Sequence, residues 1–493
     1  MPRRLSPTST CILLALCLAS GPLRGQEVAS PPTGAEAAAA LERALVEAIG
    51  RAEKSVVAIA RVRDASADAL TREFRPDPFG RRLVSPAAPA PGDPDFIPND
   101  YGTGVVIDRR GLILTAYHVL GEESSYYVTT HDRKVYRASI KGADPRSDLA
   151  VLAIDAADLA PISLGDSRTL RKGQMVIALG NPYAIARDGQ PSASWGIIAN
   201  LGRKAPPMPD ESDSVGKTTL HHFGTLIQTD ARLNLGTSGG PLLNLRGEMI
   251  GLVTALAAVA GFEQAAGYAY PIDDTFRRVL GALQQGREVE YGFLGVQPEN
   301  LAPREVLQGL QGTRVKWIRP GTPAYRYGLR PADVITSVNG VPIHDADSLV
   351  LEVGRLPVEA VVRLGVLREG RRMDLDVTLT KYPVRGKKIV TAPAPSWRGM
   401  RVDYPTAIPD SDSRAELASP LLDRSVIVVE VAQGTPAWQA GLRPGMLVSR
   451  VDRRPVRTPR EFHAAVAGKS GPVELALAEG ESEGPVRVVP PGT

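Results

Sequence analysis

The sequence predicts a mostly β chain of about three domains, and three observations support this. Its length, 493 residues, exceeds what one ordinary hydrophobic core serves. Residues 102–272 consist of short apolar runs separated by turn residues, with few helical patterns. Such spacing is typical of a β-barrel or a β-sandwich. Residues 288–490 contain an internal repeat with strand-like runs.

The repeat is read from two pairs of matching segments. Gly321-Thr-Pro-Ala324 recurs at 434–437, and Gly328-Leu-Arg-Pro331 recurs at 441–444. Both pairs are offset by 113 residues, from 321 to 434 and from 328 to 441. Strand-like runs precede and follow each copy. We therefore expect a duplicated domain of roughly 90 residues, at 288–383 and 395–490, with a linker at 384–394.

Composition excludes few functions but argues against nucleic acid as a partner. Hydrophobic residues make up 43% and charged residues 23% of the chain, as in ordinary globular proteins. The net charge is +4, and the basic residues are spread along the chain without long runs.

The N-terminus has the layout of a secretory signal. Arg3 and Arg4 precede the apolar run Cys11–Ala19, and small or turn-forming residues follow. We expect a signal peptide at 1–25 and a periplasmic or secreted protein. The apolar run is short for a bilayer span, so membrane association is not expected, although an uncleaved anchor is the alternative.

Both cysteines of the chain, Cys11 and Cys17, lie in this segment. The mature protein is therefore expected to have no disulfide, no thiol nucleophile and no cysteine metal site. We expect neither a metal nor a cofactor.

The first folded domain is expected at 40–287. It begins with an apolar helix pattern at 41–49 and a strand-like run at 55–60, and it ends with a helix pattern from Asp274 to Gly286. Residues 64–100 are rich in Pro, Asp, Arg and Gly without periodicity, which is typical of a long functional loop or a disordered one.

Three groups needed for serine-based peptide hydrolysis are found in this domain. The reaction requires a hydroxyl nucleophile, an imidazole base, a carboxylate that orients the base, and backbone N–H groups aimed at the oxyanion. Segment 236–241, Gly-Thr-Ser-Gly-Gly-Pro, permits a tight turn with Ser238 at its tip. The amides of Gly236 and Ser238 are the candidate oxyanion donors.

The base and the orienting carboxylate follow from position. Among six histidines, His118 alone directly follows an apolar strand, in Leu112-Ile-Leu-Thr-Ala-Tyr-His-Val119. Asp148 precedes another apolar strand, in Ser147-Asp-Leu-Ala-Val-Leu152. We interpret His118 as general base and acid, Asp148 as its orienting group, and Ser238 as nucleophile.

Several segments together resemble the HtrA/Deg family of trypsin-like serine proteases. They are 102–107 (GTGVVI), 115–118 (TAYH), 147–150 (SDLA), 179–182 (LGNP), 228–241 (QTDARLNLGTSGGP) and 267–272 (GYAYPI). The resemblance runs from about residue 40 to the C-terminus and implies a chymotrypsin-type double β-barrel. It also implies that 64–100 is a regulatory loop of the first barrel. Thr237 departs from the asparagine that often precedes the nucleophile in the family, but the contact expected there is from backbone.

The resemblance further implies the substrate pocket and the nature of the repeats. Leu233, Leu252 and Thr254 would line the primary pocket, and because no acidic residue lies among them, aliphatic side chains are expected in it. The repeats resemble PDZ domains, α+β modules that bind peptide C-termini. Gly292-Phe293-Leu294-Gly295 of the first copy matches the carboxylate-binding loop of the family. Segment 397–400 of the second copy, Trp-Arg-Gly-Met, matches less well.

The favoured interpretation is an exported endopeptidase that cleaves unfolded or damaged proteins, with PDZ domains that recruit substrates or regulate activity. The resemblance suggests a homo-oligomer, a trimer or a multiple of it. The alternative is a PDZ scaffold whose protease fold is inactive. The intact triad residues favour the enzyme.

Overall fold

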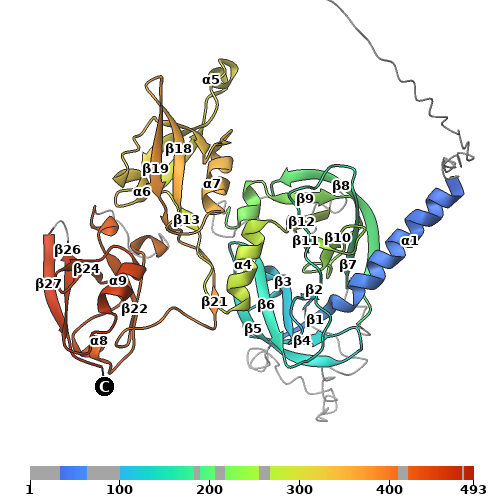
Figure 1. Ribbon diagram of the computed structural model, residues 1–493, viewed down its shortest axis with the longest axis horizontal. Helices are drawn as coiled ribbons and strands as arrows, with labels where there is room; N and C mark the ends of the chain where they lie inside the picture. Colours follow the sequence, from blue (N-terminus) through green and yellow to red (C-terminus); the bar gives the residue numbers. More distant parts are fainter. Residues whose placement is uncertain are drawn as a thin grey trace, which may run out of the picture. The chain divides into compact units, whose positions relative to one another are not determined.

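The computed structural model describes residues 34–63, 100–181, 189–205, 217–254, 267–408, 420–479 and 482–492 (Figure 1). The expected signal segment 1–25 and nearly all of the expected loop 64–100 lie outside these residues. The chain divides into two compact units, residues 1–43 and 44–493. Within the described ranges, no helix has both the length and the apolar character needed to cross a bilayer.

The first barrel has six strands that close on themselves. Its strand order is β5-β4-β1-β2-β3-β6, and β6 returns to pair with β5. The strands are β1 (Val56–Arg63), β2 (Asp100–Val106), β3 (Leu112–Ala116), β4 (Ser124–Thr129), β5 (Val135–Asp144) and β6 (Leu149–Ile154). The short apolar runs expected in this region thus include 112–115 in β3 and 149–152 in β6.

The second barrel also has six strands, in the closed order β10-β11-β12-β9-β8-β7. The strands are β7 (Met175–Gly180), β8 (Ser192–Arg203), β9 (Leu226–Thr229), β10 (Pro241–Leu243), β11 (Met249–Thr254) and β12 (Gly267–Pro271). The double β-barrel expected from the sequence is confirmed.

One helix precedes the strands of the barrels in the chain and another follows them. Helix α1 (Gly34–Ala52) leads through the 3-10 turn η1 (Glu53–Ser55) into β1. Helix α4 (Asp274–Gln284) begins at the cap residue Asp273, whose carboxylate accepts a hydrogen bond from the amide of Phe276. The helix packs against β5 and β6.

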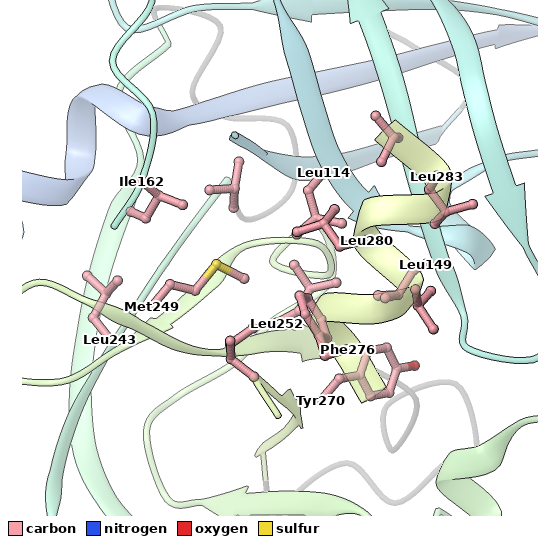
Figure 2. Packing of buried hydrophobic residues seen from close by; sticks show 14 of the residues in the cluster. Leu114, Leu149, Ile162, Leu243, Met249, Leu252, Tyr270, Phe276, Leu280 and Leu283 are labelled. Atoms are coloured by element: carbon pink, nitrogen blue, oxygen red, sulfur yellow. The ribbon is translucent and has the colours of Figure 1, made fainter. Parts of the chain in front are cut away.

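One hydrophobic cluster joins both barrels to α4 (Figure 2). Leu114 and Leu149 come from the first barrel, and Leu252 and Tyr270 come from the second. The helix contributes Phe276, Val279, Leu280 and Leu283, whose spacing places them on one face. Because a single close-packed cluster includes both barrels, the strand ends that carry the site residues are held in fixed relative positions.

The region 288–383 forms a six-stranded sheet in the order β14-β15-β16-β18-β19, with β17 paired to β16. A separate two-stranded pair joins β13, at the start of this region, to β20, near its end. The elements are β13 (Gly292–Phe293), β14 (Val296–Asn300), α5 (Pro303–Leu307), β15 (Thr313–Ile318), α6 (Pro323–Arg326), β16 (Val334–Val338), β17 (Val341–Pro342), α7 (Ala346–Gly354), β18 (Val361–Arg368), β19 (Arg371–Thr378) and β20 (Thr380–Lys381).

The region 395–490 repeats this topology in the order β22-β23-β24-β26-β27, with β25 paired to β24. The elements are β22 (Met400–Asp403), η5 (Pro405–Ala407), η6 (Pro420–Asp423), β23 (Val426–Val431), α8 (Pro436–Gln439), β24 (Leu447–Val451), β25 (Arg454–Pro455), α9 (Pro459–Val466), β26 (Val473–Glu479) and β27 (Ser482–Val489).

Matching hydrogen bonds relate the two copies at the level of single residues. The amide of Arg319 donates to the carbonyl of Gly295, and the amide of Ala324 donates to that of Leu294. The amides of residues 432 and 437, each 113 residues later, donate to the carbonyls of residues 399 and 398. Both loop glycines, Gly295 and Gly399, have φ of +88°. The loop before β22 therefore has the same backbone conformation and hydrogen bonds as the loop before β14, although their sequences match poorly.

The expected linker 384–394 contains a strand that the sequence did not predict. Strand β21 (Ile389–Val390) pairs with β5, with Ile389 opposite Ala143 and Val390 opposite Gly142. The carbonyl of Lys387 also accepts a hydrogen bond from the Tyr117 hydroxyl, 3.1 Å away. The linker thus extends the sheet of the first barrel.

Replacement of Leu280 by alanine should destabilise the barrels markedly. Leu280 is 4% exposed in the cluster shared by the barrels and α4, so we expect Leu280→Ala to lower the free energy of unfolding by about 2–5 kcal/mol. Val46→Ala is the control, because Val46 is 63% exposed on α1, and its effect should stay within about 0.5 kcal/mol. Denaturant unfolding measures both, and equal effects would contradict the assigned core.

Candidate active site

His118 and Asp148 lie in contact at neighbouring strand ends of the first barrel. His118 is in η2 (Tyr117–Val119), directly after β3, and Asp148 ends the connection from β5 to β6. Nδ1 of His118 is 2.6 Å from Oδ2 of Asp148, and the backbone amide of His118 donates a hydrogen bond to Oδ1 at 2.9 Å. The carbonyl of Asp148 accepts from the amide of Tyr117 at 2.8 Å. The carboxylate is therefore fixed from two sides.

The segment with Ser238 is a tight turn that lies against the first barrel. Gly236 and Gly239 have φ of +92° and +86°, a region that glycine enters without strain. The amide of Thr103 on β2 donates to the Ser238 carbonyl at 2.9 Å, and its hydroxyl donates to the Gly236 carbonyl at 2.7 Å. A Cβ on Gly239 would lie 2.4 Å from the Thr115 hydroxyl at the end of β3. The turn therefore lies beside the strand that leads to His118.

The electrostatics of the pair favour a buried carboxylate beside a basic imidazole. Burial lowers the pKa of His118, but the charge of Asp148 and its hydrogen bond outweigh burial and raise that pKa above 6.5. Burial raises the pKa of Asp148, but His118 and the hydroxyl of Tyr270 outweigh burial and lower that pKa below 3.8. Asp148 is thus ionised at neutral pH. The His118 side chain is 32% exposed, which leaves it accessible to a substrate.

Two further residues lie at this site that the sequence did not single out. Tyr270 on β12 donates a hydrogen bond to Oδ2 of Asp148. His221, in the 3-10 helix η4 (Leu220–Phe223), stacks on the Tyr270 ring with centroids 3.7 Å apart. The sequence does not single out His221, because it does not directly follow an apolar strand.

The residues expected around the primary pocket differ in burial. Thr254 ends β11, and its hydroxyl lies 3.2 Å from that of Tyr270. Leu252 is fully buried in the cluster shared by the barrels. Leu233 packs on the core of the second barrel, and a Cβ on Gly267 would lie 2.5 Å from it.

The expected carboxylate loop of the first repeat is anchored at both ends. Gly292 donates its amide to the carbonyl of Leu356 at 2.8 Å, and the Gly295 carbonyl accepts from Arg319. The Phe293 ring is edge-on to Tyr382, and Leu294 is buried in the core of the sheet.

A metal site was not expected from the sequence. Among the residues whose placement is described, no group of three or more histidine, cysteine and acidic side chains could hold a metal ion.

Two family models match the chain. Residues 102–252 match the trypsin-like peptidase domain, and residues 292–379 match the PDZ domain. The first range includes all three candidate triad residues, and the second includes the loop at 292–295.

Curated relatives share most of the chain. A probable periplasmic serine endoprotease DegP-like of Chlamydia trachomatis is 33% identical over 77% of this chain and 72% of its own length. The periplasmic serine endoproteases DegP of Salmonella typhimurium and Escherichia coli are each 30% identical over 77% of this chain, and over 74% and 75% of their own lengths.

Solved structures give the same relationship. The HtrA-type protease AlgW with decapeptide is 27% identical and superposes with a TM-score of 0.52, covering 69% of this chain and 99% of that one. With the double barrel and its buried carboxylate–imidazole pair, these similarities show that the chain belongs to the HtrA/Deg family of periplasmic serine endoproteases.

Proposed function

We propose that His118, Asp148 and Ser238 form the catalytic triad of this endoprotease. The observation that carries the proposal is the hydrogen-bonded pair of His118 and Asp148, 2.6 Å apart, beside the glycine turn that presents Ser238. The pair and the Ser238 turn lie at strand ends that are held in place by a common core. A reaction between preorganised groups requires such fixed positions.

The mechanism follows from the charges of the pair. His118 Nδ1 donates to the ionised Asp148, so Nε2 of the neutral ring is the basic nitrogen. It takes the hydroxyl proton as Ser238 attacks the substrate carbonyl, and Asp148 stabilises the imidazolium that forms. His118 then gives the proton to the leaving amine, and water releases the acyl group by the same path.

The backbone of the Ser238 turn supports an oxyanion site. We propose that the amides of Gly236 and Ser238 donate to the tetrahedral oxyanion. A Cβ at residue 236 would lie 2.4 Å from the Asn181 carbonyl, so glycine is required for this turn to form. Because the donors are backbone groups, Thr237 is compatible with the function.

The primary pocket is proposed to accept small or medium aliphatic side chains. Leu233, Leu252 and Thr254 supply methyl groups and one hydroxyl, with no carboxylate to pair with a Lys or Arg side chain. Leu252 and Thr254 would act through the wall of the pocket, because both side chains are buried.

The remaining chain is proposed to select substrates. We assign the protease domain to 40–287, PDZ domains to 288–383 and 395–490, and the linker to 384–394. Amides of residues 293–295 would hold a peptide carboxylate, because that of Gly292 is already bonded to Leu356. The segment 397–400 repeats this geometry with Arg398 in place of Leu294. The guanidinium of Arg398 donates to carbonyls of residues 469, 471, 489 and 490, which supports a mainly structural role for that loop.

Unfolded or damaged proteins are the proposed substrates, and a trimer or a multiple of it is the proposed assembly. A peptide-binding module joined to an endoprotease suits substrates with exposed termini. A signal peptide at 1–25 would account for the periplasmic location. The competing hypothesis of an inactive PDZ scaffold is disfavoured by the family relationship with named endoproteases.

Replacement of any triad residue should abolish most proteolysis. Ser238→Ala, His118→Ala and Asp148→Asn should each lower kcat/KM on the order of 10⁴-fold or more, and double variants should lose little more, because the three residues act as a unit. Cleavage of an unfolded protein such as reduced casein measures this. A Ser238→Ala protein as active as the parent would refute the assignment.

Activity should rise with pH. The protonated form of His118 cannot accept the serine proton, and its pKa is raised above 6.5, so the acid limb of kcat/KM should have its midpoint above 6.5. Asp148, with its lowered pKa, stays ionised throughout. A pH profile with a peptide substrate tests this, and a midpoint near pH 4 would indicate a carboxylate as the base.

Peptides with a free, apolar C-terminus should bind the first repeat. In the full-length Ser238→Ala protein, calorimetry should show binding of the free peptide and its loss on amidation, because amidation removes the charge that the 293–295 amides would hold. Gly295→Val should weaken binding, since a Cβ there would lie 2.1 Å from the Thr322 hydroxyl. The matched variant Gly399→Val, at the equivalent position of the second repeat, shows whether the peptide binds there instead. Equal affinity for free and amidated peptides would exclude the role.

A further inference from the structure

Tyr270 contacts the carboxylate that orients the catalytic imidazole. It lies on β12, is fully buried, and donates to Oδ2 of Asp148. Figure 2 shows it within the cluster shared by both barrels. The same oxygen accepts a hydrogen bond from Nδ1 of His118, while Oδ1 accepts one from the backbone amide of His118. Oδ2 thus has two donors, one from each barrel.

Tyr270 is a donor at every pH at which the enzyme works. Burial, followed by the charge of Asp148, raises the pKa of Tyr270 well above 10. Its hydroxyl proton therefore stays in place, and an ionised carboxylate is the strongest acceptor within reach.

His221 supports both Tyr270 and the backbone next to Asp148. Its ring lies parallel to that of Tyr270, at 13° and 3.7 Å. Its Nε2 is 2.8 Å from the Ser147 carbonyl and its Nδ1 is 2.7 Å from the Thr225 hydroxyl. Burial lowers the pKa of His221 to about 4, so the ring is neutral. Because a carbonyl can only accept, Nε2 carries the proton and Nδ1 accepts from Thr225.

We propose that Tyr270 is a positioning residue for catalysis, which fixes the Asp148 carboxylate through Oδ2 and moderates its attraction for the His118 imidazolium, and that His221 holds Tyr270 and the residue before Asp148 in place. This inference rests on the proposed roles of His118 and Asp148. It adds a tyrosine and a second histidine, from the other barrel, to the apparatus that orients the imidazole.

Because Tyr270 and His118 share Oδ2, the role of Tyr270 predicts the direction in which the pKa of His118 shifts when the tyrosine hydroxyl is removed. A hydrogen bond from Tyr270 withdraws charge from Oδ2, which weakens the attraction of Asp148 for the His118 imidazolium. Without the hydroxyl, the carboxylate should hold the imidazolium more strongly, and the pKa of His118 should rise. The titratable groups that face Asp148 are His118, Tyr270, His221, His222 and Tyr117. Only the first two are hydrogen-bonded to its carboxylate in the described part of the chain.

The decisive variant is Tyr270→Phe, which keeps the ring and removes the hydroxyl. In full-length Ser238→Ala protein, an NMR titration of labelled histidine should show the pKa of His118 raised by roughly half a unit or more. The NMR titration does not require proteolytic activity, so its outcome can be told apart from a failure of the proposed function. In the active enzyme, the acid limb of kcat/KM should move by the same amount, and kcat should fall several-fold with little change in KM.

Tyr291→Phe is the matched control. Tyr291 is fully buried and its hydroxyl donates at 2.5 Å to a different carboxylate, Asp144. Its loss should cost similar stability and leave the titration of His118 unchanged. An unshifted His118 in Tyr270→Phe, or an equal shift in Tyr291→Phe, would overturn the proposal, whatever the change in rate.

A second variant tests the part assigned to His221. His221→Leu should lower kcat with KM retained, and its effect should not add to that of Tyr270→Phe, because both act on Asp148 through one contact chain. Fully additive losses in the double variant would show that His221 acts independently and would exclude its proposed role.

Discussion

The buried, ionised carboxylate of Asp148 is the constraint on which the site depends. A charge removed from water is costly unless hydrogen bonds replace its hydration. Here the backbone and ring of His118 and the hydroxyl of Tyr270 provide them, and the pKa of the carboxyl is lowered although burial alone would raise it. Tyr270 comes from the second barrel and His118 from the first, so the complete set of donors requires both barrels in place. The shared hydrophobic cluster holds the two barrels together.

Glycine geometry imposes the second constraint. The turn around Ser238 needs φ values near +90° at Gly236 and Gly239, with backbone contacts too close for any side chain. Thr103 ties this turn to the first barrel through its amide and hydroxyl. Ser238, the proposed nucleophile, therefore lies in a turn that is tied to both barrels, to Thr103 of the first and to Val253 of the second.

The sequence predicted what depends on local pattern. Short apolar runs separated by turn residues predicted the strands, and the 113-residue offset predicted two similar sheets. The segments around residues 118, 148 and 238 predicted the triad candidates. It could not predict Tyr270, because a tyrosine in an apolar strand is indistinguishable from an ordinary core residue, and its partner lies 122 residues away. Strand β21 was missed for a similar reason: two residues in a polar linker carry no periodicity, and only the exposed edge of β5 makes them a strand.

If the Asp148–His118 pair makes Ser238 nucleophilic, a covalent reagent for activated serines should label that residue. The full-length enzyme is treated with a fluorophosphonate, and the modified residue is located by peptide mass mapping. We expect one label, on Ser238, that forms far more slowly in Asp148→Asn. A label on another residue, or equal labelling rates in the parent and in Asp148→Asn, would contradict this role of the pair.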